Sequence, residues 1–348
     1  MKVIVLGAGI VGTASAWFLQ KAGHEVTVIE RQPGAALETS FANGGQISVS
    51  HAEPWANPAA PKKLLKWLGR EDAPLLFRLR PEWLQWRWGL AFLRECTPSR
   101  TAHNIRQIVN IAEFSRQTLQ AVRDETGIDY DAETRGILHF YTDESEFRQS
   151  LPAAALMREL GCPRQTISAD EVVRIEPALA GIRNKIVGGD YTATDESGDV
   201  HKFSTGLAAK CVQAGVQFRF NHTVTRLLSE GTGASARITG VEVIDQHGRH
   251  QVLQADSFVL ATGSFSAPLV RPLGIDLLLY PGKGYSATYR VKDPARTPQV
   301  SLTDDGYKLV ISRLGDRLRV AGTCEINGYT RELNPVRCAA ITRRTREL

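Results

Sequence analysis

Cysteine is scarce in this chain: among its 348 residues the cysteines are Cys96, Cys162, Cys211, Cys324 and Cys338. Their number is odd and no two of them form a CxxC motif, so the sequence does not predict a disulfide framework. The eight histidines are scattered along the chain, which argues against a metal site. The cysteine content favours a reducing compartment, the cytoplasm.

Long apolar runs are lacking too. No stretch reaches the roughly eighteen uninterrupted apolar residues of a membrane-spanning helix. The apolar residues 1–12 are interrupted by glycines and include Lys2 as their one basic residue, so they do not resemble a signal peptide. The net charge of +5 is mild and no nucleic-acid-binding motif accompanies it, so no nucleic-acid partner is expected.

The clearest motif lies in the first thirty residues. Residues 3–6 are apolar and predict a strand that is buried on both faces. A GxGxxG sequence follows, then a predicted helix over 13–21 and a second predicted strand over 25–29. The phosphate-binding residues expected from this motif are Gly7, Ala8, Gly9, Ile10, Val11 and Gly12.

Each part of this motif has a physical role in binding a dinucleotide. Gly7 permits a tight turn, Gly9 lets the backbone approach a pyrophosphate, and Gly12 lets the helix pack closely on the strand. The helix N-terminus offers N–H groups and a positive dipole end to the anion. Glu30 ends the second strand, where it can accept hydrogen bonds from ribose hydroxyls and would repel the 2′-phosphate of NADP. A turn without function is the alternative, and the motif alone does not separate FAD from NAD.

Residues 31–46 favour FAD over NAD. An NAD-binding domain would usually begin its next crossover helix here, whereas this chain has small and hydroxyl residues that end in a glycine pair. Such residues suit a backbone that passes close to a phosphate and a flat ring, although an ordinary polar loop is the alternative. The cofactor contacts predicted in this segment are Arg31, Ser40, Asn43, Gly44, Gly45 and Gln46.

From this point the chain resembles the D-amino-acid oxidase superfamily of FAD enzymes. It is most similar to the family of FAD-bearing small subunits of bacterial D-amino acid dehydrogenase. The resemblance covers essentially the whole chain, and the ETS-x-x-N-x-GQIS and KGYS segments are its most specific parts. The matching segments are residues 3–48, EPAL at 176–179, DESGD at 195–199, residues 214–224, PGKGYS at 281–286 and residues 307–326.

The resemblance implies an α/β fold with two domains. One is a Rossmann-type, D-amino-acid-oxidase-like domain that binds FAD and is discontinuous in sequence; the other is a substrate domain with an antiparallel sheet and a basic, tryptophan-rich helical insertion. The predicted boundaries are 1–50 and 150–270 for the FAD-binding domain, and 51–149 and 271–335 for the substrate domain.

Two further segments fit an FAD site. A strand predicted over 215–224 would bring the backbone of Val224 to the adenine, as the resemblance implies. An apolar strand over 258–263 ends in small residues, where the chain can cross the cofactor at the carboxyl end of the sheet. The contacts expected there are Ala261, Thr262 and Gly263.

The segment from Pro54 to Arg106 has an unusual composition. It holds five of the six tryptophans, and residues 61–106 contain ten Lys or Arg against four Asp or Glu, a net of +6. Basic residues between tryptophans suit a surface that lies on anionic lipid, although a helical insertion packed on its own domain is the alternative. The resemblance implies peripheral contact with the cytoplasmic face of the bacterial inner membrane and electron transfer to a quinone or another respiratory acceptor.

The implied reaction is the oxidative deamination of D-amino acids such as D-alanine. A hydride leaves the α-carbon for flavin N5, and the imine hydrolyses to a 2-oxo acid and ammonia. No base is required if the amine enters neutral, so no catalytic residue is assigned. The candidates for binding the substrate are Tyr285, Tyr307 and Lys283. An oxygen-using amine oxidase of the glycine or sarcosine oxidase type is an alternative function.

Chains of the resembling family usually continue beyond the point where this sequence stops. They carry an arginine–proline and an aspartate–glycine motif and then a glycine-rich turn against the flavin, whereas this chain stops at Leu348 without them. The resemblance therefore implies that a C-terminal piece of the FAD-binding domain is missing. We expect weak FAD retention and little turnover from these residues, and an inactive fragment is the remaining alternative.

Overall fold

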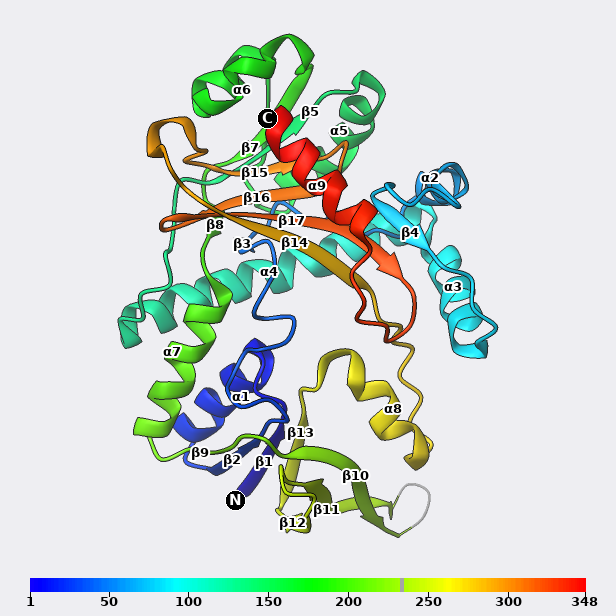
Figure 1. Ribbon diagram of the computed structural model, residues 1–348, viewed down its shortest axis with the longest axis vertical. Coiled ribbons are helices and arrows are strands. Elements are labelled where there is room, and N and C mark those ends of the chain that lie inside the picture. The colour runs from blue at the N-terminus through cyan, green and yellow to red at the C-terminus, as the bar shows by residue number, and fades with distance from the viewer. Residues whose placement is uncertain (232–234) are drawn as a thin grey trace. The chain divides into compact units, whose positions relative to one another are not determined.

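The computed structural model describes residues 1–231 and 235–348, and these residues form two compact units (Figure 1). Each unit is assembled from segments that are far apart in the sequence. Unit 1 comprises Met1–Ala42, Thr126–Tyr130 and Val200–Leu279, and unit 2 comprises Asn43–Glu125, Asp131–Asp199 and Tyr280–Leu348.

Unit 1 contains a parallel sheet that, in the described residues, has the strand order β13-β1-β2-β9. Its strands are β1 (Lys2–Leu6), β2 (Glu25–Ile29), β9 (Gln217–Arg219) and β13 (Ser257–Leu260). Helix α1 (Ile10–Lys21) connects β1 to β2 and packs against α7 (Val200–Gln213). Residues 3–6 are buried, as their apolar sequence predicts. The predicted order of strand, glycine turn, helix and strand is confirmed.

A smaller antiparallel sheet completes unit 1. It consists, where the chain is described, of β10 (Thr223–Glu230), β11 (Arg237–Ile244) and β12 (His250–Gln254), and it shares a hydrophobic core with β1 and β2. The short helices η3 (Gly263–Phe265), α8 (Ser266–Val270) and η4 (Arg271–Leu273) follow β13.

The single strand predicted over 215–224 is wrong, because two strands of different sheets share this segment. Asn221 adopts a φ of 56° between β9 and β10. A residue in the left-handed region of backbone conformation changes the direction of the chain, and asparagine tolerates that conformation better than most residues. The chain thus leaves the parallel sheet after Arg219 and enters the antiparallel one at Thr223.

Unit 2 is organised around a large sheet with the order β14-β17-β16-β15-β5-β7-β6 among the described residues, and β4 pairs with β17. We predicted an antiparallel sheet, but the sheet is mixed: β5 pairs with β15, and β4 with β17, in parallel. Its strands are β4 (Leu75–Phe77), β5 (Ile137–Tyr141), β6 (Gln165–Ile167), β7 (Gly188–Thr192), β14 (Lys283–Arg290), β15 (Ser301–Asp304), β16 (Leu309–Leu314) and β17 (Arg317–Ile326). A separate pair is formed by β3 (Gln46–Ile47) and β8 (Glu196–Ser197).

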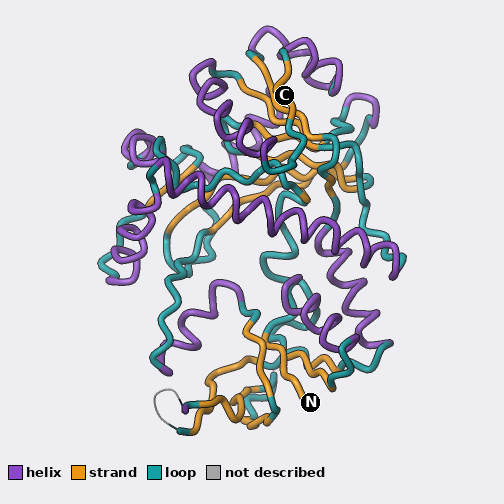
Figure 2. The backbone as a smooth tube through the Cα atoms, turned by 180° about the vertical axis from the view of Figure 1, so that it is seen from behind, coloured by secondary structure: helices purple, strands orange, loops and turns teal. Residues whose placement is uncertain are grey.

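Helices cover both faces of this sheet. Apolar residues recur every three or four positions between Ile105 and Val122, and they lie on α4 (Pro98–Thr126), which ends before Gly127, a residue with φ of 63°. Helix α9 lies in front of the strands in Figure 1, and α4 lies in front of them in the view from behind in Figure 2. The other helices of unit 2 are α2 (Ala60–Trp67), α3 (Trp83–Glu95), α5 (Glu144–Glu159), α6 (Ala169–Ile175), η1 (Pro177–Lys185), η5 (Pro294–Arg296) and α9 (Pro335–Glu347).

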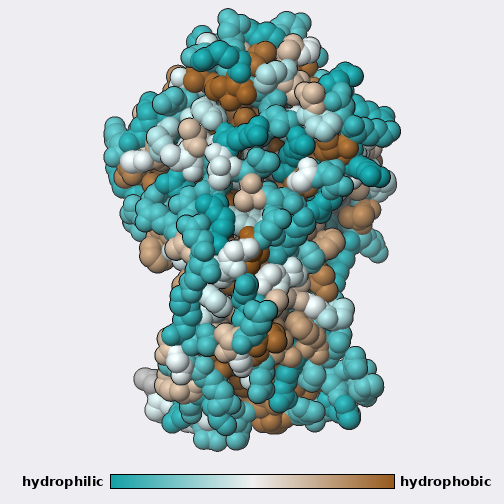
Figure 3. Space-filling model, turned by 90° about the vertical axis from the view of Figure 1, so that its left-hand side faces the viewer, coloured by the Kyte–Doolittle hydropathy of each residue, from teal (hydrophilic) through white to brown (hydrophobic). Residues whose placement is uncertain are grey.

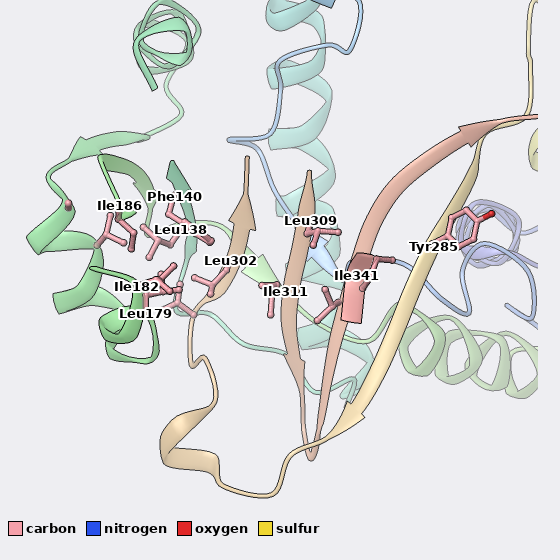
Figure 4. Packing of buried hydrophobic residues seen from close by; sticks show 14 residues of the cluster. Leu138, Phe140, Leu179, Ile182, Ile186, Tyr285, Leu302, Leu309, Ile311 and Ile341 are labelled. Carbon is pink, nitrogen blue, oxygen red and sulfur yellow. The ribbon is translucent and has the colours of Figure 1, made fainter. Parts of the chain in front are cut away.

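The two faces of the unit 2 sheet differ in polarity. On one face Leu138, Phe140 and Leu302 are fully buried and belong to a cluster that includes Ile341 of α9 (Figure 4). Successive side chains of a strand point to opposite faces, so the other face receives the residues between them, such as His139. The sheet therefore has an apolar face that forms the core and a more polar face that is available for a site.

The compact units divide the chain differently from the predicted domains. We assigned residues 150–199 to the FAD-binding domain, whereas they belong to unit 2. The reason is strand pairing: β6 joins β7, and β7 joins β5 in the unit 2 sheet. Residues 271–279, assigned to the substrate domain, belong to unit 1 because they directly follow α8.

The surface is largely hydrophilic on the face drawn in Figure 3, where hydrophobic residues gather in small groups. None of the described helices combines the length and the apolar content that crossing a membrane requires.

We expect Phe140→Ala to destabilise unit 2 by about 3–5 kcal/mol, because it removes a fully buried ring from the core and leaves a cavity. Urea unfolding followed by circular dichroism measures this loss. The matched control is Leu65→Ala, whose side chain is 76% exposed and whose loss should cost less than about 0.5 kcal/mol. Equal stability losses in the two variants would contradict the assigned core.

Candidate functional site

The glycines of the GxGxxG motif form an open turn in unit 1. Gly7 has a φ of +101°, and its N–H donates to the Ile29 carbonyl over 2.8 Å. A Cβ on Gly12 would lie 1.8 Å from the Gly7 oxygen, so only glycine fits where the helix meets the strand. A Cβ on Gly9 would meet nothing closer than Ser40 Oγ at 3.5 Å among the described atoms. The backbone at Gly9 is thus accessible to a ligand.

Helix α1 presents its N-terminus to this turn. Gly9 is the N-cap of α1 and, as a glycine, has no side chain that could cap the helix. The first turn of α1 contains no acidic residue. The Ile10 N–H donates to Ser40 Oγ over 3.0 Å, which brings Ser40 to the same place as the glycines. N–H groups at the positive end of a helix dipole fit a diphosphate. These residues therefore fit the ADP part of FAD.

Glu30 and Arg31 lie beside the glycine turn. The Glu30 carboxylate is 8% exposed and accepts from the N–H groups of Ala8 at 2.8 Å and Gln32 at 2.9 Å. Each carboxylate oxygen can accept a second hydrogen bond, which leaves capacity for a ribose hydroxyl. The Arg31 guanidinium pairs with Glu38 at 2.8 Å and lies 4.0 Å from the centre of the Phe265 ring.

The predicted contacts near the end of β13 also lie in unit 1. Ala261 donates its N–H to the Leu6 carbonyl over 2.9 Å, and its own carbonyl lies 2.6 Å from the place where a Cβ on Gly7 would stand. Thr262 shares a 3.0 Å hydrogen bond with Ser266, and Gly263 has a φ of +57°. Residues 261–263 therefore adjoin the glycine turn.

Val224 lies two residues beyond a segment that is bonded to the end of β2. His222 N–H donates to the Glu30 carbonyl over 2.9 Å, and Asn221 N–H to the Gln32 carbonyl over 3.1 Å. The position of Val224 is compatible with the predicted adenine contact, which stays a prediction.

Asn43, Gly44, Gly45 and Gln46 belong to unit 2, in contrast to the contacts above. The Gly44 carbonyl accepts from Ser312 over 2.7 Å, and a Cβ on Gly44 would lie 2.9 Å from Val310. Gly45 has a φ of +66°, and a Cβ there would lie 2.7 Å from the Gly198 oxygen. Packing on the sheet thus explains both glycines without a cofactor, and their contact with the flavin stays a prediction.

Gln46 leads from this segment to a cavity in unit 2. Its Nε2 donates to Ser301 over 3.0 Å and to Thr303 over 3.2 Å. Thr303 and Val310 both line the cavity, whose volume is about 330 Å³. The predicted flavin-side segment therefore packs directly on the cavity wall.

The cavity has a charged end and an apolar wall. The charged end is formed by charged and polar residues that include His51, Glu53, His139, Arg164, Asp305 and Lys308. The wall is formed mainly by Trp55, Leu64, Trp67, Leu75 and Phe92. A pocket with a few converging polar groups and an apolar remainder is the usual form of a site for a small organic molecule.

Asp305 is the centre of the charged end. It accepts from His139 Nδ1 and from Lys308 Nζ, each over 2.9 Å. Burial by itself raises the pKa of Asp305, but the hydrogen bond to His139, followed by the charge and hydrogen bond of Lys308, outweighs burial and holds that pKa well below its usual value. Asp305 is therefore ionised.

His51 and Glu53 are shifted toward their neutral forms. Burial, followed by the neighbouring His139, lowers the pKa of His51 to about 4. The accessible surface of His51 borders the cavity, and its ring centre lies 5.4 Å from that of His139. Burial raises the pKa of Glu53, which accepts from Asn57 over 3.0 Å. With a pKa of about 4, His51 is neutral at neutral pH.

Arg164 is anchored rather than mobile. Its guanidinium donates to Asp190 over 2.8 Å, to the Tyr141 hydroxyl over 3.0 Å and to the Ser50 carbonyl over 2.6 Å. Asp190 is fully buried, and Arg164 is 5% exposed. This pair fixes one side of the cavity and neutralises its own charges.

Tyr285, Lys283 and Tyr307 are not among the described residues that line the cavity. Tyr285 is 4% exposed and donates to Glu325 over 2.5 Å, while Lys283 lies 3.1 Å from the same carboxylate. Burial and then Glu325 raise the pKa of Tyr285. Tyr307 lies apart, with the Arg344 guanidinium 4.2 Å from its ring centre. Their role in substrate binding stays a prediction, and the structure gives Tyr285 and Lys283 a common structural partner.

The sequence did not reveal the cavity residues, because they come from separate segments. His51 follows β3, His139 lies on β5, and Asp305 and Lys308 lie in the turn between β15 and β16. One signal was present: His139 interrupts an otherwise apolar and aromatic strand, Ile137–Tyr141, whose five residues are all buried. A histidine at such a position needs a polar partner.

Comparisons with known proteins identify the family and the fold of the chain. A family model described as FAD dependent oxidoreductase matches residues 2–348. The chain is 56% identical to a D-amino acid dehydrogenase of Dechloromonas aromatica over 348 residues, which are 100% of this chain and 82% of that protein. It is 52% identical to a D-amino acid dehydrogenase of Paramagnetospirillum magneticum, covering 100% of this chain and 81% of that protein.

Solved structures share the fold at low sequence identity. Glycine oxidase from Geobacillus kaustophilus matches with a TM-score of 0.72 and 20% identity, over 99% of this chain and 77% of that one. L-proline dehydrogenase from P.horikoshii matches with a TM-score of 0.71 and 17% identity, over 100% of this chain and 76% of that one. The expected α/β fold with a D-amino-acid-oxidase-like FAD-binding part is thereby confirmed.

We expect Gly12→Ala to weaken FAD binding by at least about tenfold, because the added Cβ would meet the Gly7 carbonyl at 1.8 Å and force the turn apart. Titration of the protein with FAD, followed by quenching of flavin fluorescence, measures the affinity. Gly89→Ala is the control, since a Cβ there meets no described atom within 4 Å. An unchanged affinity in Gly12→Ala would remove the glycine turn from the cofactor site.

Proposed function

The chain belongs to the family of FAD-dependent oxidoreductases, and from that membership we propose that it oxidises D-amino acids to 2-oxo acids and ammonia. FAD is its cofactor. The observation that carries the substrate class is full-length similarity to relatives named D-amino acid dehydrogenase. The charged and apolar ends of the unit 2 cavity support it, because a zwitterion with an aliphatic side chain needs both.

The residues of unit 1 hold the cofactor in this proposal. Bound FAD supplies the hydride acceptor, the flavin N5. The N–H groups at Gly9 and along the first turn of α1 bind the diphosphate, and Glu30 accepts from a ribose hydroxyl. Gly44 and Gln46, the predicted flavin contacts of unit 2, pack on the cavity wall through Val310 and Thr303.

The unit 2 cavity holds the amino acid in this proposal. Lys308 attracts the carboxylate, and the ammonium faces Glu53, His51 and His139. Trp55 and Leu64 contact the side chain and exclude water from it. A volume of about 330 Å³ accepts D-alanine and leaves room for larger apolar side chains.

The oxidase alternative differs in its electron acceptor. One fold neighbour is a glycine oxidase, but its 20% identity supports the fold alone. We propose a respiratory acceptor such as a quinone, because the relatives that match the whole chain are named dehydrogenases.

The surface of α2 and α3 supports a membrane-bound acceptor. Leu65 is 76% exposed and Trp83 is 74% exposed, and Lys62 and Lys66 are exposed beside Leu65 on α2. Exposed apolar side chains next to lysines suit the interface of an anionic bilayer, where rings and aliphatic chains enter and ammonium groups meet the head groups. We propose that this surface contacts anionic lipid at the cytoplasmic face of the bacterial inner membrane.

The substrate proposal predicts that D-alanine reduces an artificial acceptor dye on the order of 10² times faster than L-alanine does, because the chiral centre must present its hydrogen to the flavin. Dye absorbance measured with FAD-loaded protein gives both rates. Peroxide release in air at the rate of dye reduction would instead support the oxidase alternative. No flavin bleaching with any D-amino acid would contradict the proposed function.

The membrane proposal predicts that the double variant Leu65→Ser/Trp83→Ser loses most of its binding to vesicles that contain phosphatidylserine, since it removes two exposed apolar anchors. Vesicle co-sedimentation at low and high salt measures the binding. Val252→Ser, a change at a 55% exposed site on β12, is the control. Equal binding to neutral and anionic vesicles would contradict the role of the lysines.

A further inference from the structure

His139 combines a fixed orientation with an unused nitrogen. Its Nδ1 lies 2.9 Å from Asp305 Oδ2, and its side chain is 3% exposed. Its Nε2 is buried and has no hydrogen-bond partner in the described part of the chain. A buried polar atom without a partner costs stability of about 1–3 kcal/mol, and a ligand in the cavity that His139 lines could complete it. Arg164 Nε and Thr323 Oγ1 of the same cavity also have no partner in the described residues, but neither atom is a base.

The carboxylate of Asp305 decides what Nε2 can do. Asp305 is ionised and only accepts hydrogen bonds, so the Nδ1 of His139 carries the proton. In the neutral imidazole the other nitrogen is then a lone-pair acceptor, and it is also the basic atom. The α-ammonium of an amino acid is the donor that such a nitrogen would bind.

We propose that His139 is a catalytic residue that removes a proton from the α-ammonium of the substrate, with Asp305 as the residue that positions it. This inference rests on the proposed function and adds a general base to the proposed reaction. The ammonium N–H bond breaks and its proton goes to Nε2, which leaves a neutral amine. Bound FAD would accept the hydride of the α-carbon as the amine lone pair forms the C=N bond, so that the amino acid would be oxidised and FAD reduced.

The surrounding charges favour this transfer. Asp305 stabilises the imidazolium that forms, and its bond to Lys308 holds it in place without reaching Nε2. His51 is the nearest titratable ring and is neutral at neutral pH, so it does not oppose a charge on His139. Among the charged and titratable groups, Asp305 is bonded to His139, His51 has its ring centre 5.4 Å away, and Asp190 on β7 is the partner of His139 across the strand pair. Lys308 is bonded to Asp305 and Arg164 to Asp190, and Tyr141 lies two residues further along β5.

The more distant charges balance each other. Arg164 is paired with Asp190 at 2.8 Å, and Lys63 of α2 is paired with Glu146 of α5 at 3.1 Å. Glu53 has a raised pKa because of burial, and a remaining negative charge on it would assist an ammonium in entering. The charges of these pairs are already compensated. His139, which Asp305 orients and whose Nε2 has no partner in the described residues, is therefore the base that we assign to the proton of the α-ammonium.

The test compares pH profiles of FAD-loaded wild type and His139→Gln with D-alanine and an acceptor dye. We expect kcat/KM of His139→Gln to fall on the order of 10²–10⁴-fold at neutral pH, the usual contribution of a general base. The deficit should shrink as the pH rises toward 10, because the substrate then enters as the free amine. A merely structural role for His139 would give a deficit that does not change with pH, and that outcome overturns the proposal.

Asp305→Asn is the second variant, because an amide can donate to Nδ1 and turn Nε2 into a donor. It should reproduce both the loss at neutral pH and the recovery at high pH. His250→Gln, a change at a surface histidine of unit 1 that pairs with Glu242, is the control and should keep the wild-type profile. Normal activity of Asp305→Asn at neutral pH would overturn the positioning role.

Binding of 2-aminoisobutyrate gives a readout that is independent of turnover, since this amino acid lacks the α-hydrogen and is not oxidised. Calorimetry should show at least about tenfold weaker binding to His139→Gln, as expected when a hydrogen bond to a charged group is lost. Unchanged affinity contradicts the contact. If the wild type oxidises no D-amino acid, the proposed function fails; if it does and His139→Gln shows no pH-dependent loss, this inference alone fails.

Discussion

The site in unit 2 depends on the carboxylate of Asp195. It is fully buried and accepts from the N–H groups of Val49 at 3.0 Å and Ser50 at 3.1 Å, and from Ser48 Oγ at 3.0 Å. A buried charge is tolerated only when hydrogen bonds replace its hydration, so these donors and the carboxylate fix each other. The clamped segment continues directly into His51, which lines the cavity, and follows the stretch that carries Gln46.

The neighbours of Asp195 extend this clamp along the chain. Glu196 pairs with Arg123 of α4 at 2.7 Å, and Ser197 pairs with Gln46 in the ladder of β3 and β8. Asp199 pairs with Arg317 of β17 at 2.7 Å. The DESGD segment is thus an anchor that ties the predicted flavin-side segment to a helix and to the sheet, and its acids need no direct part in the chemistry.

The features that the sequence predicted well are those whose residues are close in the chain. The glycine turn lies within six consecutive residues, and α4 follows from a stripe that repeats every three or four positions. The cavity depends instead on strand order. His139 lies opposite Thr303 because β5 pairs with β15, a parallel pairing that no local pattern encodes. The substrate contact of Tyr285 stays a prediction, and its hydrogen-bond partner Glu325, which lies on the adjacent strand, is visible only in the folded chain.

The charge balance of the cavity limits what it can bind. Lys308 is paired with Asp305 at 2.9 Å and Lys63 with Glu146 at 3.1 Å, and Arg164 is neutralised by a buried aspartate. A ligand with a net charge would therefore add a charge that these pairs do not compensate, which costs free energy where the ligand loses its hydration. A zwitterion adds no net charge and places its two ends against these local dipoles. In the described part of the chain, the cavity residues His139, Arg164 and Thr323 each keep a buried polar atom without a hydrogen-bond partner, namely Nε2, Nε and Oγ1. Of these three atoms, His139 Nε2 is the one that can take up a proton, because a guanidinium has no acceptor and a hydroxyl is not basic.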